Sequence, residues 1–280
     1  MKKIISLALC VLMLASVVLS IASCGNNVAP NIIGVQAGTT GQYFVDGDAD
    51  WGFEGINGYQ SKGYSNPGLA IQDMKNKAVK FVIVDKAPAQ HLVKSIDGIK
   101  MININLTEEQ YAFGVDKNQA ELLQSINNIL KTKKTDIQAI INKYAKGENI
   151  VGVESAKKDL DRQDEQLVVA TNAAFAPFEY KDGDKFVGID IEIMKLVADE
   201  LGLELVIEDM EFDSVVTSVG SHGIDVAAAA LSVNETRKKS VNFTSTYYNA
   251  AQVLIVPSST TRFEDCKTAA DVLAKLEEAR

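Results

Sequence analysis

The chain has 280 residues, of which 46% are hydrophobic and 23% are charged, and its formal net charge is -9. This composition is typical of a folded globular protein long enough for two domains, which excludes an intrinsically disordered chain. The acidic surplus, with no long basic run, argues against nucleic-acid binding. The 3 cysteines and 2 histidines show no metal-ligand spacing, so no metal site is expected.

The first 23 residues have the pattern of an export signal. Lys2 and Lys3 precede an apolar stretch over residues 4–22, which ends at Ser23 and Cys24. This ending resembles the lipobox of bacterial lipoproteins, in which the cysteine is acylated and becomes the first residue after cleavage. The resemblance implies a signal peptide over 1–23, a lipid on Cys24, a polar tether over 24–31 and a location outside the cytoplasm, at the cell membrane. An uncleaved anchoring helix is the alternative.

Apolar periodicity predicts strands and helices in alternation after the tether. In the first half we expect a strand over residues 32–36, a helix over 69–77, a strand over 79–84 that ends at Asp85, and helices that begin near residues 117 and 135. Thr135 and Gln138 fit a capping box for the last of these helices. Residues 146–166 are charged and aperiodic, which is typical of a linker.

The alternation begins again after this linker. We expect a strand over residues 167–171, a helix that includes Ile189 and Leu201, a strand over 203–209, a short helix from 213, strands over 226–231 and 251–256, and a terminal helix over 267–280. Strands that alternate with helices predict an α/β fold, with a mostly parallel sheet that is covered on both faces.

Four motifs after the linker resemble one protein family. They are Ala-Thr-Asn-Ala-Ala-Phe-Ala-Pro-Phe-Glu-Tyr at 170–180, Gly-Ile-Asp at 188–190, Asp-Val-Ala-Ala-Ala-Ala-Leu-Ser-Val-Asn-Glu-Thr-Arg-Lys-Lys at 225–239 and Asn-Phe-Thr-Ser-Thr-Tyr-Tyr at 242–248. In this order they resemble the first lobe of the polar-amino-acid-binding proteins of ABC importers, and the glutamine-binding members are the most similar. The resemblance implies a two-lobed periplasmic-binding-protein-like fold of type II.

The segment before the linker resembles the rest of the same family, in rotated order. Ile-Gly-Val-Gln-Ala-Gly-Thr-Thr at 33–40 and Phe-Val-Ile-Val-Asp at 81–85 resemble its second lobe, and Tyr-Ala-Phe-Gly-Val at 111–115 resembles the return to the first lobe. Two explanations are open. One is a circular permutation of a single receptor, which the single occurrence of each motif favours, and the other is a fragment of a tandem array broken across two copies.

Under permutation the resemblance implies a particular division of the chain. Residues 31–108 and 263–280 form the lobe with the Gly-Thr-Thr motif, and residues 109–258, with the linker inside them, form the other. The chain then crosses between the lobes at residues 105–110 and 257–262. A monomer is expected, because one chain contains a complete receptor.

The resemblance also implies how a free amino acid binds. The ligand carboxylate requires a cation and N–H donors, whereas its ammonium requires an anion. Arg237 matches the residue that binds the carboxylate, assisted by the backbone N–H groups of Thr39 and Thr40. Asp85 matches the residue that binds the ammonium, and Ser232 is an expected further polar contact.

Other matched residues face the ligand side chain. Phe175 and Phe212 match two aromatic positions that sandwich it. Separately, the Ala230 carbonyl is expected to join Ser232 as a further polar contact. Asn172 matches the position that often contacts the distal polar group, and Gln36 matches a position that often carries a cation. Because Asn172 is neutral, we expect an uncharged polar amino acid, with glutamine as first choice over lysine or arginine. Without the motifs, each residue also fits a plain core, turn or surface role.

The expected function is therefore an extracytoplasmic amino-acid-binding lipoprotein that delivers its ligand to an ABC importer, with no cofactor. Two alternatives are open. The same fold hosts enzymes such as cyclohexadienyl dehydratases, but neither His91 nor His222 lies in a matched motif, so no enzymatic activity is expected. An amino-acid-sensing module for a membrane partner would bind the same ligand.

Overall fold

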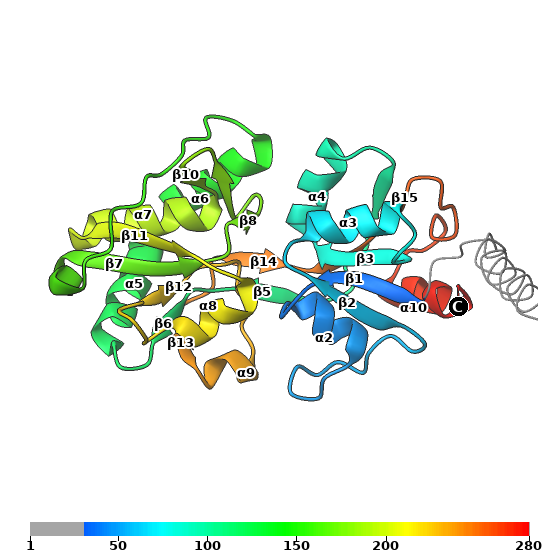
Figure 1. Ribbon diagram of the computed structural model, residues 1–280, viewed down its shortest axis with the longest axis horizontal. Coiled ribbons are helices and arrows are strands. Elements are labelled where there is room, and N and C mark those ends of the chain that lie inside the picture. Colours follow the sequence, from blue (N-terminus) through cyan, green and yellow to red (C-terminus); the bar gives the residue numbers. More distant parts are fainter. Residues whose placement is uncertain (1–30, 280) are drawn as a thin grey trace, which may run out of the picture.

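Two five-stranded sheets, each in its own lobe, organise residues 31–279, the part of the chain that the computed structural model describes (Figure 1). The predicted signal peptide, the lipidation site Cys24 and nearly all of the tether lie outside the described residues. Strands and helices alternate in both lobes, so the expected two-lobed α/β class is confirmed. Within residues 31–279 no helix combines the length and the apolar character needed to span a membrane.

The first lobe contains the Gly-Thr-Thr motif. Its strands, in sheet order, are β2 (Gln60–Tyr64), β1 (Ile32–Gln36), β3 (Phe81–Asp85), β15 (Gln252–Pro257) and β4 (Ile99–Ile102). Strands β1, β2 and β3 run parallel, whereas β15 is antiparallel to both of its neighbours. Its helices are α2 (Thr40–Asp46), α3 (Pro67–Lys75), α4 (Lys86–Ser95) and α10 (Ala269–Glu278).

The second lobe is built in the same way. Its main sheet has the order β11 (Glu204–Asp209), β7 (Gln166–Thr171), β12 (Val226–Ala227), β6 (Gly114–Asp116) and β13 (Val241–Phe243). A smaller sheet contains β10 (Lys185–Val187), β9 (Glu179–Asp182) and β8 (Ala174–Phe175). The helices are α5 (Ala120–Thr132), α6 (Lys134–Lys146), α7 (Ile189–Leu201), α8 (Phe212–Ser218) and α9 (Glu235–Lys238), with a 3-10 turn over Leu160–Glu165.

Helix α10 completes the core of the first lobe. Its Val272 and Leu276 are fully buried and pack in one cluster with Ile33 and Val35 of β1. The helix begins with a capping box, in which Thr268 and Asp271 exchange hydrogen bonds. The last residues of the described chain therefore pack against its first strand.

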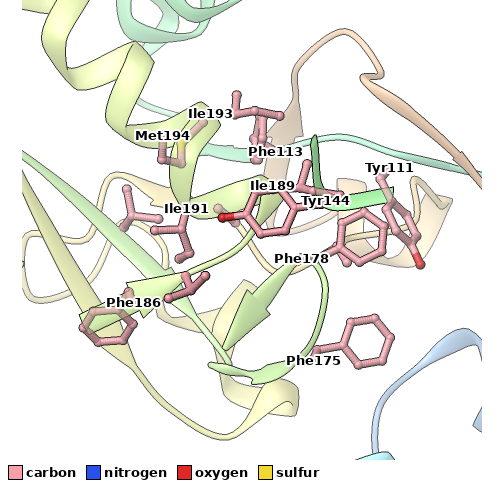
Figure 2. Close-up of a cluster of buried hydrophobic side chains, with 14 of the residues drawn as sticks. Tyr111, Phe113, Tyr144, Phe175, Phe178, Phe186, Ile189, Ile191, Ile193 and Met194 are labelled. Atoms are coloured by element: carbon pink, nitrogen blue, oxygen red, sulfur yellow. The ribbon is translucent and has the colours of Figure 1, made fainter. Parts of the chain in front are cut away.

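The second lobe has an aromatic part of its core, drawn in Figure 2. Phe178 is fully buried and meets the ring of Tyr111 edge-on, with their centroids 5.1 Å apart. The Tyr111 hydroxyl points away from this cluster (Figure 2). The cluster thus fixes the ring of Tyr111 and leaves its polar end to bond elsewhere.

The lobes are joined by a two-stranded antiparallel sheet, formed by β5 (Glu109–Tyr111) and β14 (Tyr248–Ala250), which lies between them in Figure 1. This corrects two boundaries. Residues 252–257 belong to the first lobe, not to a lobe that ends at residue 258, and the second crossing lies at β14, not at residues 257–262. Apart from Gln252 at its start, strand β15 is apolar and fits the centre of either sheet, so its pattern does not identify its partner strands.

Two expected local features are also wrong. Helix α6 has Lys133 at its N-cap with no side-chain capping bond, so Thr135 does not cap it; α5 and α6 abut at this residue, which takes the position the cap would occupy. The strand expected over residues 226–231 is only two residues long. It ends before Ala230, whose φ of 47° takes the backbone out of the extended region.

Candidate functional site

A cavity between the lobes collects the residues that the sequence motifs indicate. Its volume is ≈ 10 Å³, and ≈ 250 Å³ when all unfilled space is counted, including the open solvent at its mouth. All of the predicted ligand-binding residues except Asn172 line it: Gln36, Thr39, Thr40, Asp85, Phe175, Phe212, Ala230, Ser232 and Arg237. Both lobes contribute to the lining. Gln36, Thr39, Thr40 and Asp85 come from the first lobe, and the other residues of this list come from the second.

Arg237 lies on α9 of the second lobe and is 7% exposed. Its Nη1 donates to the Ser232 carbonyl (2.9 Å), and its Nη2 donates across the cleft to the Gly38 carbonyl (3.3 Å). Gly38 has φ of 73°, and a Cβ atom there would lie 3.2 Å from Cβ of Asp213. Glycine is therefore required where the first lobe approaches the second.

Arg237 forms no direct ion pair with the described residues, although the charges of Glu109 and Asp85 act on it from farther away. Within residues 31–279 no carboxylate oxygen lies within 4.0 Å of its guanidinium. Burial lowers the pKa of Arg237 to about 10, and the group still carries its charge at neutral pH. A buried cation is costly unless an anion or several acceptors compensate it, so this group favours an anion in the cavity.

Asp85 ends β3 and begins α4, and it is 6% exposed. The Tyr111 hydroxyl donates a hydrogen bond to its Oδ1. Burial, with the nearby Glu109 carboxylate as a second cause, raises the pKa of Asp85 to about 7. A buried carboxylate that is partly protonated at neutral pH gains from a cation beside it, because the cation favours the charged form.

A chain of hydroxyl groups crosses the cleft beside Asp85. Thr40 Oγ1 donates to Ser232 Oγ (3.2 Å), and Ser232 Oγ donates to Glu109 Oε2 (2.5 Å). Thr39 is the N-cap of α2, although its hydroxyl donates back to the Gln36 carbonyl (2.7 Å) and not to the helix. The backbone N–H of Thr39, a predicted carboxylate donor, instead donates to the Gln36 carbonyl (3.4 Å). The N–H of Thr40, at the first position of the helix, has no partner inside the helix and is available to an acceptor.

The side-chain amides of Gln36 and Asn172 form another contact between the lobes. Gln36 Nε2 donates to Asn172 Oδ1 (2.8 Å), and Asn172 Nδ2 donates to the Met210 carbonyl (2.7 Å). Asn172 does not line the cavity, but this bond connects it to Gln36, which does. The buried Oε1 of Gln36 has no hydrogen-bond partner within residues 31–279, so this cavity residue has an unpaired acceptor.

Phe175 and Phe212 both line the cavity, as the motifs predict. Phe175 is buried beside Phe178, with ring centroids 6.3 Å apart. Phe212 also contacts the predicted carboxylate-binding residue, because Arg237 Cζ lies 5.4 Å from the centre of its ring. The cavity therefore offers apolar walls next to its charged end.

Several residues around this site have no counterpart in the sequence prediction. Tyr111 and Glu109 reach Asp85 and Ser232 from the strand that joins the lobes. Trp51 lies over Arg237, with Cζ 5.0 Å from its ring centre. Tyr111 lies inside a matched motif, which is a usable signal, whereas Trp51 lies in a glycine-rich loop that has no motif.

The lining gives little basis for metal or acid–base chemistry by histidine. Within residues 31–279 no group of three His, Cys, Asp or Glu side chains has metal-binding geometry. Neither His91 nor His222 lines the cavity. Asp85 is the only carboxylic acid among the lining residues of the described chain.

A sequence profile of the bacterial extracellular solute-binding proteins, family 3, matches residues 167–279. Among curated proteins, the chain is 36% identical over 109 residues to the arginine-binding extracellular protein ArtP of Bacillus subtilis, a match that covers 39% of this chain and 40% of ArtP. It is 30% identical over 105 residues to a probable amino-acid ABC transporter-binding protein of Haemophilus influenzae, covering 36% of this chain and 41% of that protein.

Among solved structures, the chain is similar to the arginine-bound domain 1 of TmArgBP in its Phe57Trp form, at 29% identity over 42% of this chain and 91% of that one. The TM-score of 0.30 is too low to indicate a shared overall fold. The chain spans about 40% of the length of the curated relatives it matches. The similarity to the family thus covers residues 167–279, the part that contains Asn172, Phe175, Phe212, Ala230, Ser232 and Arg237.

Proposed function

We propose that this chain is an extracytoplasmic receptor that binds a free polar amino acid between its lobes and delivers it to an ABC importer. Arg237 binds the ligand carboxylate, and Asp85 binds the ligand ammonium. The names of the similar proteins support this class of function. The lipid on Cys24 holds the receptor at the cell membrane, and no cofactor takes part.

The observation that carries the proposal is the pairing of charges across the cavity. Arg237 is a buried cation without a carboxylate partner within the described residues, and Asp85 is a buried carboxylic acid with a raised pKa. An amino-acid zwitterion supplies one opposite charge to each of them at a fixed spacing. Both buried groups are then compensated by one ligand.

We propose a ligand with an uncharged side chain that ends in an N–H donor, and glutamine as first choice. The open acceptor Oε1 of Gln36 is suited to an amide N–H, and Asn172 is neutral. The guanidinium of an arginine ligand would need a carboxylate near Gln36. Glu179 and Glu211, the carboxylates beside Phe178 and Phe212 in the sequence, do not line the cavity. Arginine, which ArtP is named for binding, is the competing ligand that the experiment must include.

Ligand entry requires the lobes to separate. Contacts across the cleft, such as those from Gln36 to Asn172 and from Arg237 to Gly38, close the cavity. Strands β5 and β14 are the segments through which the chain passes between the lobes near this site. They are therefore the hinge of the proposed motion.

The test is a thermal-shift panel of free amino acids, followed by titration calorimetry. A ligand at 100 times its Kd stabilises the folded state by about 2.7 kcal/mol, so glutamine should raise the Tm clearly. Arg237→Ala should abolish this shift, whereas Lys238→Ala, which removes the neighbouring exposed cation, should keep it. A panel in which no amino acid raises the Tm would contradict the function, and arginine binding more tightly than glutamine would contradict the choice of ligand.

We further propose that the chain is a circularly permuted receptor. Helix α10 packs on β1 inside the same lobe, which supports a self-sufficient chain over a broken array. Lys80 Nζ donates both to Asn31 Oδ1 (3.0 Å) and to the Ala279 carbonyl, so residues 31 and 279 lie close together. Permutation is tolerated when such ends are adjacent at the surface.

A second permutation tests this proposal. A variant that joins residue 279 to residue 31 through a short Gly-Ser linker, and opens the chain within residues 147–159, should fold and bind with unchanged affinity. The matched control opens the chain inside the buried strand β3, between Val82 and Ile83, and should not fold. Failure of the first variant to fold, when the parent chain folds, would contradict the permutation.

A further inference from the structure

The loop over residues 47–59, between α2 and β2, has a fixed shape near its tip. Asp48 and Phe53 exchange backbone hydrogen bonds, both 2.9 Å long, and the Asp48 side chain accepts from the Trp51 backbone N–H (3.1 Å). These bonds close a tight turn that presents Asp50 and Trp51. The tip is therefore a preformed part of the first lobe.

This tip reaches the second lobe at Arg237. The guanidinium Cζ lies 5.0 Å from the centre of the Trp51 ring and 5.4 Å from that of Phe212. The guanidinium of Arg237 is thus within cation–π distance of two aromatic rings, one from each lobe. Trp51 is itself supported by Tyr43 of α2, with ring centroids 4.3 Å apart and an interplanar angle of 18°. Beside this contact, Lys239 Nζ and Asp50 Oδ2 form an ion pair at 3.1 Å.

We propose that Trp51 is a positioning residue, which holds the guanidinium of Arg237 and couples ligand binding to closure of the lobes. This inference rests on the proposed function. The ring covers one face of the guanidinium and attracts its charge, which leaves the N–H edge for the ligand carboxylate. Covering by the ring also excludes water, and a bond between Arg237 and a carboxylate is stronger in a drier environment.

The contact between Trp51 and Arg237 should contribute more to ligand binding than the neighbouring Lys239–Asp50 ion pair. Both members of the Lys239–Asp50 pair are more than half exposed, and such ion pairs contribute little. Trp51, in contrast, packs on Tyr43 and contacts a buried cation. Loss of the ring should therefore matter more than loss of the ion pair.

Titration calorimetry with glutamine, and with any amino acid that the panel identifies, measures the contribution to binding. Trp51→Ala should weaken binding about tenfold, Trp51→Phe by about threefold or less, and Lys239→Gln by less than threefold. The matched control is Phe53→Ala on the same loop, whose ring packs edge-on against Phe44. Wild-type affinity in Trp51→Ala, or an equal loss in Phe53→Ala, would overturn the inference.

A measurement without ligand tests the contact between Trp51 and Arg237, on which the inference depends, even if no amino acid binds. Trp51 is the only tryptophan in the sequence, so tryptophan fluorescence reports the surroundings of this one ring, which include Tyr43 and Arg237. In the ligand-free protein, Arg237→Ala should raise the acrylamide quenching constant about twofold, because one face of the indole becomes exposed, whereas Lys238→Ala should not. An unchanged constant in folded Arg237→Ala would show that Trp51 does not cover Arg237. A panel without any ligand, combined with the predicted quenching, would contradict the proposed function and leave the contact itself supported.

Discussion

Asp85 and Asp190 are both buried, and burial raises the pKa of each to about 7, but their surroundings differ. Asp190 lies in α7; the Tyr247 hydroxyl donates to its Oδ1 and the Ala230 N–H to its Oδ2 (2.9 Å). Asp190 does not line the cavity, whereas Asp85 does. A perturbed pKa alone therefore does not distinguish a binding group from a group that holds the fold; access to the cavity does.

Exchange of each carboxylate for an amide separates the two roles. Asp85→Asn should weaken amino-acid binding on the order of a hundredfold, because a buried ligand ammonium loses its counter-charge. Its Tm without ligand should stay the same or rise at pH 8, since a buried charge is removed. Asp190→Asn should bind within about threefold of the parent but lose about 1–3 kcal/mol of stability, because one of its two donors loses its acceptor. Calorimetry and thermal unfolding measure both quantities.

An Asp190→Asn variant that stays folded but loses binding as strongly as Asp85→Asn would contradict the separate roles of the two carboxylates. That outcome would place the ammonium near α7 instead of at the end of β3. Asp97→Asn, at an exposed position, is the control for a general effect of lower negative charge and should change neither quantity.

The pH dependence should have opposite signs for affinity and for stability. Binding requires ionised Asp85, whose pKa is about 7, so affinity should fall about tenfold between pH 8 and pH 6. The pKa of Asp85 and Asp190 is raised above its unfolded value of 3.8. The stability that they contribute is therefore fully present below about pH 4 and is lost as the pH rises through about 7.

Thermal unfolding without ligand and calorimetry with ligand, both between pH 5 and pH 8, measure the two trends. The Tm should fall as the pH rises, while the affinity increases. In Asp85→Asn the residual binding should not depend on pH in this range. Affinity in the parent protein that stays constant from pH 6 to pH 8 would contradict the assignment of the ammonium to Asp85.

A carboxylate introduced at Asn172 tests which end of the cavity sets the selectivity. Asn172→Asp keeps an oxygen that accepts from Gln36 Nε2 and adds a negative charge. The ratio of arginine to glutamine affinity should rise about fivefold or more, as expected for a partly buried ion pair. The variant should lose about 1 kcal/mol of stability, because the Met210 carbonyl loses its donor. Competition calorimetry gives the ratio, and an unchanged ratio would show that Asn172 is remote from the ligand side chain.

The smallest expected effects come from removing the hydroxyl groups of Tyr111 and Tyr247, which donate to Asp85 and Asp190. The Tyr111 hydrogen bond lowers the pKa of Asp85, so Tyr111→Phe should raise that pKa further. Its affinity at pH 7 should fall about threefold, with a midpoint of the pH profile shifted upward. Tyr247→Phe should lose about 1 kcal/mol of stability and keep the parent's affinity and midpoint. Equal midpoints in the two variants would contradict the separate roles.

Much of the cavity could be predicted from local sequence, because each lobe supplies its residues in short motifs. The Gly-Thr-Thr turn, the strand that ends at Asp85 and the segment that contains Arg237 all lie at the cavity. These residues sit at the ends of strands or at the start of helices. Their roles follow from the resemblance of the surrounding motifs to the amino-acid-binding family, because periodicity alone does not distinguish them from cap, turn or surface residues.

The contacts that cross between lobes could not be predicted in this way. Tyr111 reaches Asp85, and Trp51 reaches Arg237, only because two separately folded sheets come together. The expected division of the chain places strand β15 in the wrong lobe for a related reason, since a mostly apolar strand fits either sheet. The sequence pattern also does not predict helix α4, which begins directly after Asp85 with no turn residues between strand and helix.

A crystal structure of the protein with glutamine most directly tests the binding of an amino acid by Arg237 and Asp85. The ligand carboxylate should lie about 3 Å from the Nη atoms of Arg237, and its ammonium about 3 Å from a carboxylate oxygen of Asp85. The ring of Trp51 should cover the guanidinium in the same structure. A ligand that lies outside the cavity, or that contacts neither charged residue, would contradict this account.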